Sequence, residues 1–319
     1  MTRASVLLLL VAAVVVTVGC RKLPPGTRIE GAREQVEVRD TLGPLLEALE
    51  AGRPVTEAFT AYEVQHAALL EAVGAAPNDP GDVLLHKLAA SPEALVALLR
   101  PFHAQAGDEA RALIAALETK LGALPPVVLV FGASRGTEAV FHGSASGDRR
   151  PLVLFNARGP SLGPPGARQA TMTRELFSAW QRAASPEGER LGPLARAVWS
   201  EGAAHFAART TVPDLLETDL FGLDERRLGA LRNRVPLMAK ELLSGLDSGS
   251  EAERDRFFDE GVRDPLLPPG AGPFIAERLY QRIAADLGSV DRPLRLSPDE
   301  FLQRARPALQ AIAAQRDGR

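Results

Sequence analysis

The chain has 319 residues, of which 37 are Lys or Arg and 40 are Asp or Glu, so its formal net charge is −3. This balance lacks the concentrated positive charge of a nucleic-acid-binding protein, so no nucleic-acid partner is expected. One cysteine excludes an internal disulfide framework and a thiolate metal site, and stability must come from a hydrophobic core.

The first twenty residues have the layout of an export signal. Arg3 precedes the apolar run 6–16, which is shorter than the roughly 20 residues that a membrane-spanning helix needs. The segment 17–20 (Thr-Val-Gly-Cys) then resembles the lipobox of bacterial lipoproteins, although leucine is more usual than Thr17 at its position. This resemblance implies that residues 1–19 are a signal peptide and that lipid, palmitate included, is attached to Cys20.

The mature protein is therefore expected to be anchored to a membrane through Cys20 and not to span it. An uncleaved signal anchor is the alternative. Arg21 stands where an aspartate would indicate retention in the inner membrane, so a cell-envelope location at the outer membrane is favoured in a cell that has one. Residues 20–30 form the tether, which is rich in Pro and Gly.

Residues 31–124 are predicted to form a helical region. Apolar residues recur at helical spacing from Leu42 to Leu49, and the same spacing continues through residues 55–73, 95–102 and 113–121. The pair Pro125-Pro126 then stops the last helix.

Three short β-strand patterns follow at residues 127–131, 138–142 and 151–155, and they predict a small antiparallel sheet. The glycine-rich turn 132–136 resembles the phosphate loop of short-chain dehydrogenases. However, Glu138 replaces the last glycine of that fingerprint, and a strand pattern follows where a helix is required. The turn is therefore interpreted as a hairpin connection, and no nucleotide is expected.

Helical patterns fill the rest of the chain, at residues 172–180, 194–206, 228–242, 275–287 and 301–312. Ser297 and Glu300 stand at capping-box spacing ahead of the last of them. The expected fold class is α+β and predominantly helical, with residues 125–319 forming one compact unit with residues 31–124.

From about Val127 onward, the order of a short sheet, a helix and a second helix with an acidic residue resembles the gluzincin-type metallopeptidases. It is most similar to bacterial families of predicted zinc-dependent proteases. Those carry HExxH on one helix and a glutamate in a run such as W-x-E-G-x-A on a later one. The matching segments here are residues 174–178 (Arg-Glu-Leu-Phe-Ser) and 199–202 (Trp-Ser-Glu-Gly). The resemblance implies a zincin-like region at residues 125–319.

The matching positions lack the metal-binding histidines. In HExxH, two histidines on one helical face bind Zn²⁺, and the glutamate activates the bound water. Here the histidine positions hold Arg174, which has no lone pair to donate, and Ser178, whose hydroxyl is a poor zinc ligand. Only Glu175 at the general-base position and Glu201 at the third-ligand position keep their types. The resemblance thus implies a pseudoenzyme with vestigial carboxylates, no metal and no other cofactor.

Arg174 is expected to project into the former metal position and to form a bidentate ion pair with Glu201. The alternative is that both residues are unrelated and exposed. In the gluzincin-like families a late helix tends to begin with a Gly-Tyr-Tyr-like run near the active site. The corresponding stretch 270–275 carries Phe274, which has no hydroxyl to stabilise an oxyanion.

The five histidines offer little replacement for the missing ligands. His205 follows Glu201 by one helical turn and is predicted to lie on a helix surface. His66 is predicted to be a structural histidine with its hydrogen bonds satisfied. The other three have no partner at a recognised ligand spacing: His86, His103 and His142.

These patterns predict a lipid-anchored envelope protein whose inactive metallopeptidase-like region holds a peptide or protein as an added strand. Two alternatives remain open. One is an active metallopeptidase or other hydrolase with a non-standard site built on Glu175, Glu201 and His205. The other is a structural envelope lipoprotein that docks a partner through its N-terminal helices, which exposed apolar area on those helices would favour.

Overall fold

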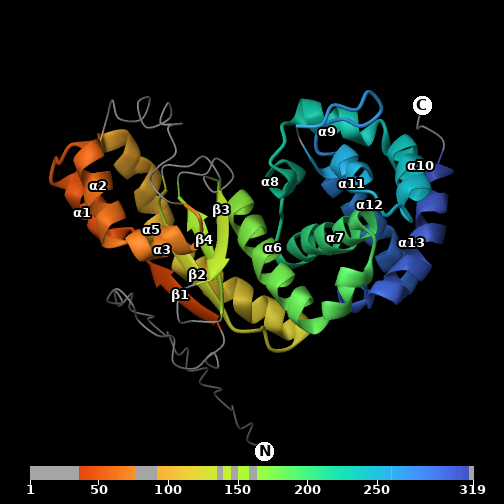
Figure 1. Ribbon diagram of the computed structural model, residues 1–319, viewed down its shortest axis with the longest axis horizontal. Helices are drawn as coiled ribbons and strands as arrows, with labels where there is room; N and C mark the ends of the chain where they lie inside the picture. Colours follow the sequence, from red (N-terminus) through yellow and green to blue (C-terminus); the bar gives the residue numbers. More distant parts are fainter. Residues whose placement is uncertain are drawn as a thin grey trace, which may run out of the picture.

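The computed structural model describes residues 36–75, 92–134, 139–144, 150–157, 164–259 and 261–315. The predicted signal peptide, Cys20, the tether and His86 lie outside these ranges. The described residues form a predominantly helical α+β fold with one four-stranded sheet, which confirms the predicted fold class (Figure 1). None of the helices described is both long enough and apolar enough to cross a membrane.

The sheet is mixed, so the prediction of an antiparallel sheet was wrong. Its strands are β1 (Val36–Asp40), β2 (Val127–Gly132), β3 (Val140–Ser144) and β4 (Pro151–Asn156), in the order β1-β2-β4-β3. Strands β1 and β4 run parallel to β2, and only β3 runs antiparallel to its neighbour β4. Strand β1 was not predicted, because its short Val-Glu-Val-Arg-Asp alternation lies just before a strong helical pattern.

The turn at residues 132–136 does not connect a hairpin, which corrects a second prediction. Strand β4 lies between β2 and β3, so the chain passes from β2 to the edge of the sheet and returns through the β3–β4 hairpin. All six residues of β2 are buried. A strand buried on both faces belongs in the interior of a sheet, and parallel neighbours on both sides place β2 there.

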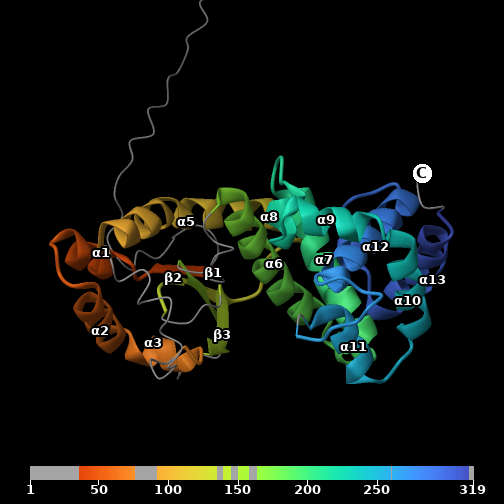
Figure 2. The same cartoon turned by 90° about the horizontal axis from the view of Figure 1, so that it is seen from above.

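The N-terminal helices cover both faces of the sheet. They are α1 (Gly43–Glu50), α2 (Val55–Gln65), α3 (Ala67–Ala72) and α5 (Pro92–Leu121). Helix α5 lies over one face and α3 over the other (Figure 2). The patterns at 95–102 and 113–121 therefore belong to one long helix, which continues through Pro101.

The C-terminal part is a group of packed helices. They are α6 (Pro165–Ala184), α7 (Pro193–Thr211), α8 (Glu217–Phe221), α9 (Glu225–Arg232), α10 (Val235–Gly245), α11 (Glu251–Phe258), α12 (Ala271–Leu287) and α13 (Pro298–Ala313). The pattern at 228–242 is divided between α9 and α10, and neither α8 nor α11 was predicted. The predicted capping box is present: the Ser297 backbone N donates to Glu300 Oε2 at 3.0 Å, and Ser297 Oγ accepts from the Glu300 backbone N.

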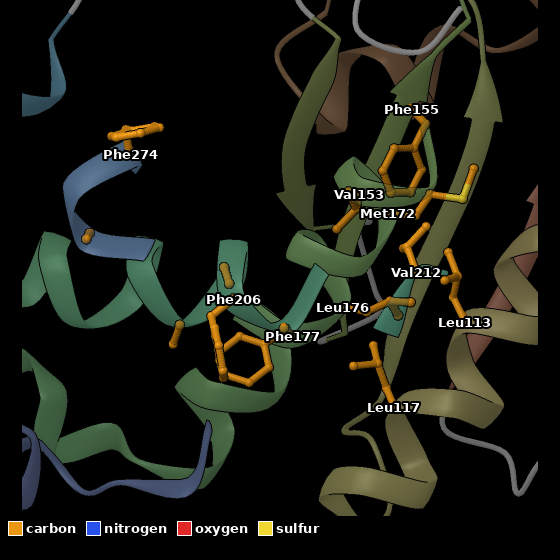
Figure 3. Packing of buried hydrophobic residues seen from close by; sticks show 14 of the residues in the cluster. Leu113, Leu117, Val153, Phe155, Met172, Leu176, Phe177, Phe206, Val212 and Phe274 are labelled. Atoms are coloured by element: carbon orange, nitrogen blue, oxygen red, sulfur yellow. The ribbon is translucent and has the colours of Figure 1, made fainter. Parts of the chain in front are cut away.

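Helix α6 joins the two halves through one continuous hydrophobic core. Its Met172 and Leu176 pack near Leu113 and Val153, which come from α5 and β4 (Figure 3). The same cluster extends into α7, α12 and α13. Fully burying one such side chain stabilises the fold by about 1.5–3 kcal/mol, so α6 is held firmly between the sheet and α7.

A buried ion pair fastens α6 to α5. Arg168 is only 2% exposed, and its Nε and Nη2 donate to the two carboxylate oxygens of Glu109 at 2.6 and 2.7 Å. Nη2 also donates to Gln105 Oε1 at 3.1 Å, and the guanidinium lies 5.6 Å from the centre of the Phe102 ring. The sequence pattern gave no indication of this pair, because its two residues are 59 positions apart.

Replacing Arg168 alone is expected to destabilise the fold. Arg168→Met would lower the free energy of unfolding by about 3 kcal/mol, because it leaves the Glu109 carboxylate, whose side chain is only 14% exposed, without its cation. The double variant Arg168→Met with Glu109→Leu should recover most of this loss, since no unpaired charge remains. Urea unfolding of both variants measures the two values. Equal destabilisation in the single and double variants would show that the unpaired carboxylate is not the cause.

Candidate functional site

The two helices that match the peptidase motifs lie against each other. On α6, Thr171, Arg174 and Ser178 lie on one face, because residues three and four apart are neighbours on a helix. Helix α7 brings Glu201 and His205 to this face, since Arg174 contacts His205 directly and acts electrostatically on Glu201. The structure therefore brings Arg174, Glu175 and Glu201, which the sequence selected, close together.

The Trp-Ser-Glu-Gly run on α7 has a packing role that fixes this arrangement. Gly202 faces α12, where a Cβ atom would lie 2.9 Å from the carbonyl oxygen of Ala276. Trp199 donates through Nε1 to the Leu296 carbonyl at 3.3 Å, and its own carbonyl accepts from the Tyr280 hydroxyl at 2.9 Å. A glycine here lets α7 and α12 approach closely, and that contact helps to fix the position of α7 and of its neighbouring residue Glu201.

His205 is buried, and the prediction that it lies on a helix surface was wrong. The residue is 2% exposed, and its ring stacks on Phe221 of α8 with the centroids 5.4 Å apart. Nδ1 lies 2.8 Å from the backbone oxygen of Glu201. Nε2 lies 2.8 Å from Arg174 Nη1. Since arginine only donates, Nε2 is the acceptor and the proton resides on Nδ1.

The electrostatics agree with a neutral ring. Burial, followed by the positive charge of Arg174, lowers the pKa of His205 from 6.5 to about 3. The hydrogen bond to the Glu201 backbone opposes this change but does not offset it. The imidazole is therefore uncharged at physiological pH, and both of its nitrogens are engaged within the protein.

Glu201 lies beside Arg174 but does not form the predicted bidentate pair, which corrects that expectation. Among the described residues, Arg174 donates to His205 and, at 3.2 Å, to Thr171 Oγ1. The Glu201 carboxylate comes no closer than 3.9 Å to His205 Nδ1, and its side chain is 50% exposed. Loss of water around the carboxyl raises the pKa of Glu201, and the charge of Arg174 lowers it by less. The buried imidazole, and not the accessible carboxylate, takes the guanidinium hydrogen bond.

A second contact was not predicted at all. His142 on β3 places Nε2 3.4 Å from Oε2 of Glu175, a largely buried residue of α6. On β3, Phe141 packs on the α3 side of the sheet, so the neighbouring His142 points to the opposite side, toward α6. This pair joins the edge strand to the helix, and no local spacing in the sequence relates the two residues.

Helix α8 packs against His205 of the site through Phe221. Its Phe221 lies between His205 and Phe274, with 5.2 Å between the centroids of the two phenylalanine rings. At the other end of α8, the Glu217 carboxylate accepts from Arg232 at 2.6 Å and is also bound by Arg209 and Arg278. These ion pairs from α7, α9 and α12 hold α8 in place. Phe274 therefore adjoins the site through Phe221.

The remaining histidines within the described ranges lie elsewhere. His103 Nδ1 is 2.6 Å from Asp40 Oδ2, at the end of β1. The His66 ring packs against Tyr62 in a tilted arrangement with the centroids 4.6 Å apart, but its buried Nε2 has no hydrogen-bond partner among the described residues. The prediction that His66 is fully satisfied was therefore wrong for that nitrogen.

The residues present do not fit a catalytic zinc ion. Within the described part of the chain, no group of three or more His, Cys, Asp or Glu side chains is placed to hold a metal. The one buried imidazole at the site has no free lone pair, because Nε2 accepts from Arg174 and Nδ1 carries a proton.

Comparisons with protein-family models, curated proteins and solved structures found no match to this chain. The function is therefore argued from the site's own geometry.

Proposed function

We propose that this chain is a lipid-anchored cell-envelope protein, held through Cys20, whose zincin-like region binds an extended peptide or protein segment and lacks metallopeptidase activity. The outer membrane is the favoured location in a cell that has one. The hydrogen bond from Arg174 to Nε2 of His205 carries the proposal. In the proposed zincin-like region, the guanidinium would stand at the zinc position, and its hydrogen bond uses the lone pair that a metal would need.

The edge of the sheet supports the binding part of this proposal. Strand β3 is an edge strand with β4 on one side. The backbone N of Asn156 donates to the Ala139 oxygen, so the alternation of an antiparallel ladder turns the backbone groups of Val140, His142 and Ser144 away from β4. A peptide can form main-chain hydrogen bonds with these groups as an added strand.

The two alternatives have weaker support. His205 is uncharged and engaged at both nitrogens, which argues against it as the general base of a hydrolase. In the described part of the N-terminal helices, Val64 is the one large hydrophobic residue that is strongly exposed. A single exposed side chain is ordinary on a protein surface and does not form a docking patch.

Removing a backbone N–H of β3 that points away from β4 tests the proposed function. A library of extended peptides is first screened for binding to the full-length chain in detergent micelles. Ser144→Pro removes one outward N–H while leaving the ladder to β4 intact, and should weaken binding of the selected peptides about tenfold. Ser144→Ala keeps the N–H and should bind like the unaltered chain. A library with no binders, or equal affinity in both variants, would contradict the proposal.

A further inference from the structure

The central outward residue of β3 reaches one carboxylate of α6, and a second carboxylate lies nearby on α7. His142 is the central outward residue of the strand, and its side chain reaches Glu175 at 3.4 Å. Arg174, the neighbour of Glu175 on α6, contacts His205, whose Nδ1 lies 3.9 Å from the Glu201 carboxylate. Glu201 therefore lies near Glu175, and it interacts electrostatically with both Glu175 and His142. Since side chains alternate along an added strand, every second side chain of a bound peptide would point to the α6 side of the sheet, and the one beside His142 would lie nearest the two glutamates.

Within the described ranges, neither carboxylate accepts a hydrogen bond from an arginine or lysine. Glu175 has only the accessible His142 in ion-pair range among the described residues. Glu201 has only Nδ1 of His205, whose proton is donated to the backbone. The guanidinium of Arg174 is turned toward His205 and Thr171. Arg182 also acts on Glu201, but it is exposed and forms no ion pair among the described residues.

We infer that the peptide held along β3 carries a basic side chain, lysine or arginine, whose charged end lies between Glu175 and Glu201. The inference rests on the proposed function, because it needs a strand bound at β3. A charged donor from the ligand would give both carboxylates the direct partner that Arg174 does not give them. It would also distinguish basic peptides from neutral ones that make the same main-chain hydrogen bonds.

Matched peptides test this inference. The probe is a fluorescein-labelled ten-residue peptide of alternating threonine and valine with one central lysine, and its twin carries norleucine in place of lysine. Fluorescence anisotropy with the full-length chain in detergent should give about tenfold tighter binding of the lysine peptide. In the double variant Glu175→Gln with Glu201→Gln, the ratio of the two affinities should fall to about one. The matched control, Glu187→Gln with Glu189→Gln, makes the same change in net charge on the surface turn before α7 and should keep the tenfold ratio.

Each outcome decides between the two claims. Equal binding of the two peptides by the unaltered chain, or a ratio that persists without the two glutamates, would overturn the inference and leave the proposed function standing. A ratio lost equally in the control variant would assign the preference to net charge and would also overturn the inference. Failure of both peptides to bind, together with an empty library screen, would overturn the proposed function itself.

Discussion

Acidification is expected to destabilise this protein by about 5 kcal/mol through His205 alone. The pKa of His205 falls from 6.5 to about 3 on folding, so the unfolded chain takes up this proton first as the pH falls. The stability that the neutral ring contributes is complete above pH 6.5, decreases as the pH falls below that value, and is fully lost near pH 3.

Urea unfolding at a series of pH values measures this effect. His205→Gln should lower stability at neutral pH and should also remove about one proton from the uptake on unfolding between these two pH values. The control Phe274→Leu changes a buried ring that packs on the other side of Phe221 and does not titrate, and it should lower the unfolding free energy by a similar amount at every pH. If His205→Gln and the unaltered chain show the same pH dependence, the ring is not held neutral by its surroundings.

Local patterns in the sequence were sufficient to predict most of the helices and strands. The capping box at Ser297 and Glu300 formed as predicted, because all of its partners lie within one helical turn. The strands β2, β3 and β4 appear within two residues of their predicted positions. The predicted pairing of these strands was wrong. Strand β2 pairs with β4 and with β1, which lies far away in the chain, and local patterns do not report such long-range contacts.

The sequence predicted some of the residues of the candidate site but not their contacts, and it missed His142 and Phe221. Motif spacing selected Arg174, Glu175 and Glu201, and the α6–α7 packing brings them together. Periodicity could not show that His205 is buried, because α7 is enclosed by other helices and has no clear solvent face. A buried neutral acceptor then takes the Arg174 hydrogen bond in place of Glu201. The contact between His142 and Glu175 depends on the tertiary fold alone.

Removing the cation should restore a zinc site. In the double variant Arg174→His with Ser178→His, two imidazoles on one face of α6 would lie opposite Glu201 and leave one coordination position for water. Ser178→His alone is the matched control. It adds an imidazole but keeps the guanidinium of Arg174 against His205, so it should bind no zinc tightly.

The measurement that tests the central claim is zinc content by mass spectrometry, after incubation with Zn²⁺ and exhaustive dialysis. We expect no zinc above background in the unaltered chain or in the single variant, and about one ion per chain in the double variant. One tightly held ion in the unaltered chain would contradict the claim that Arg174 occupies the metal position. An empty double variant would contradict the zincin-like geometry on which that claim depends.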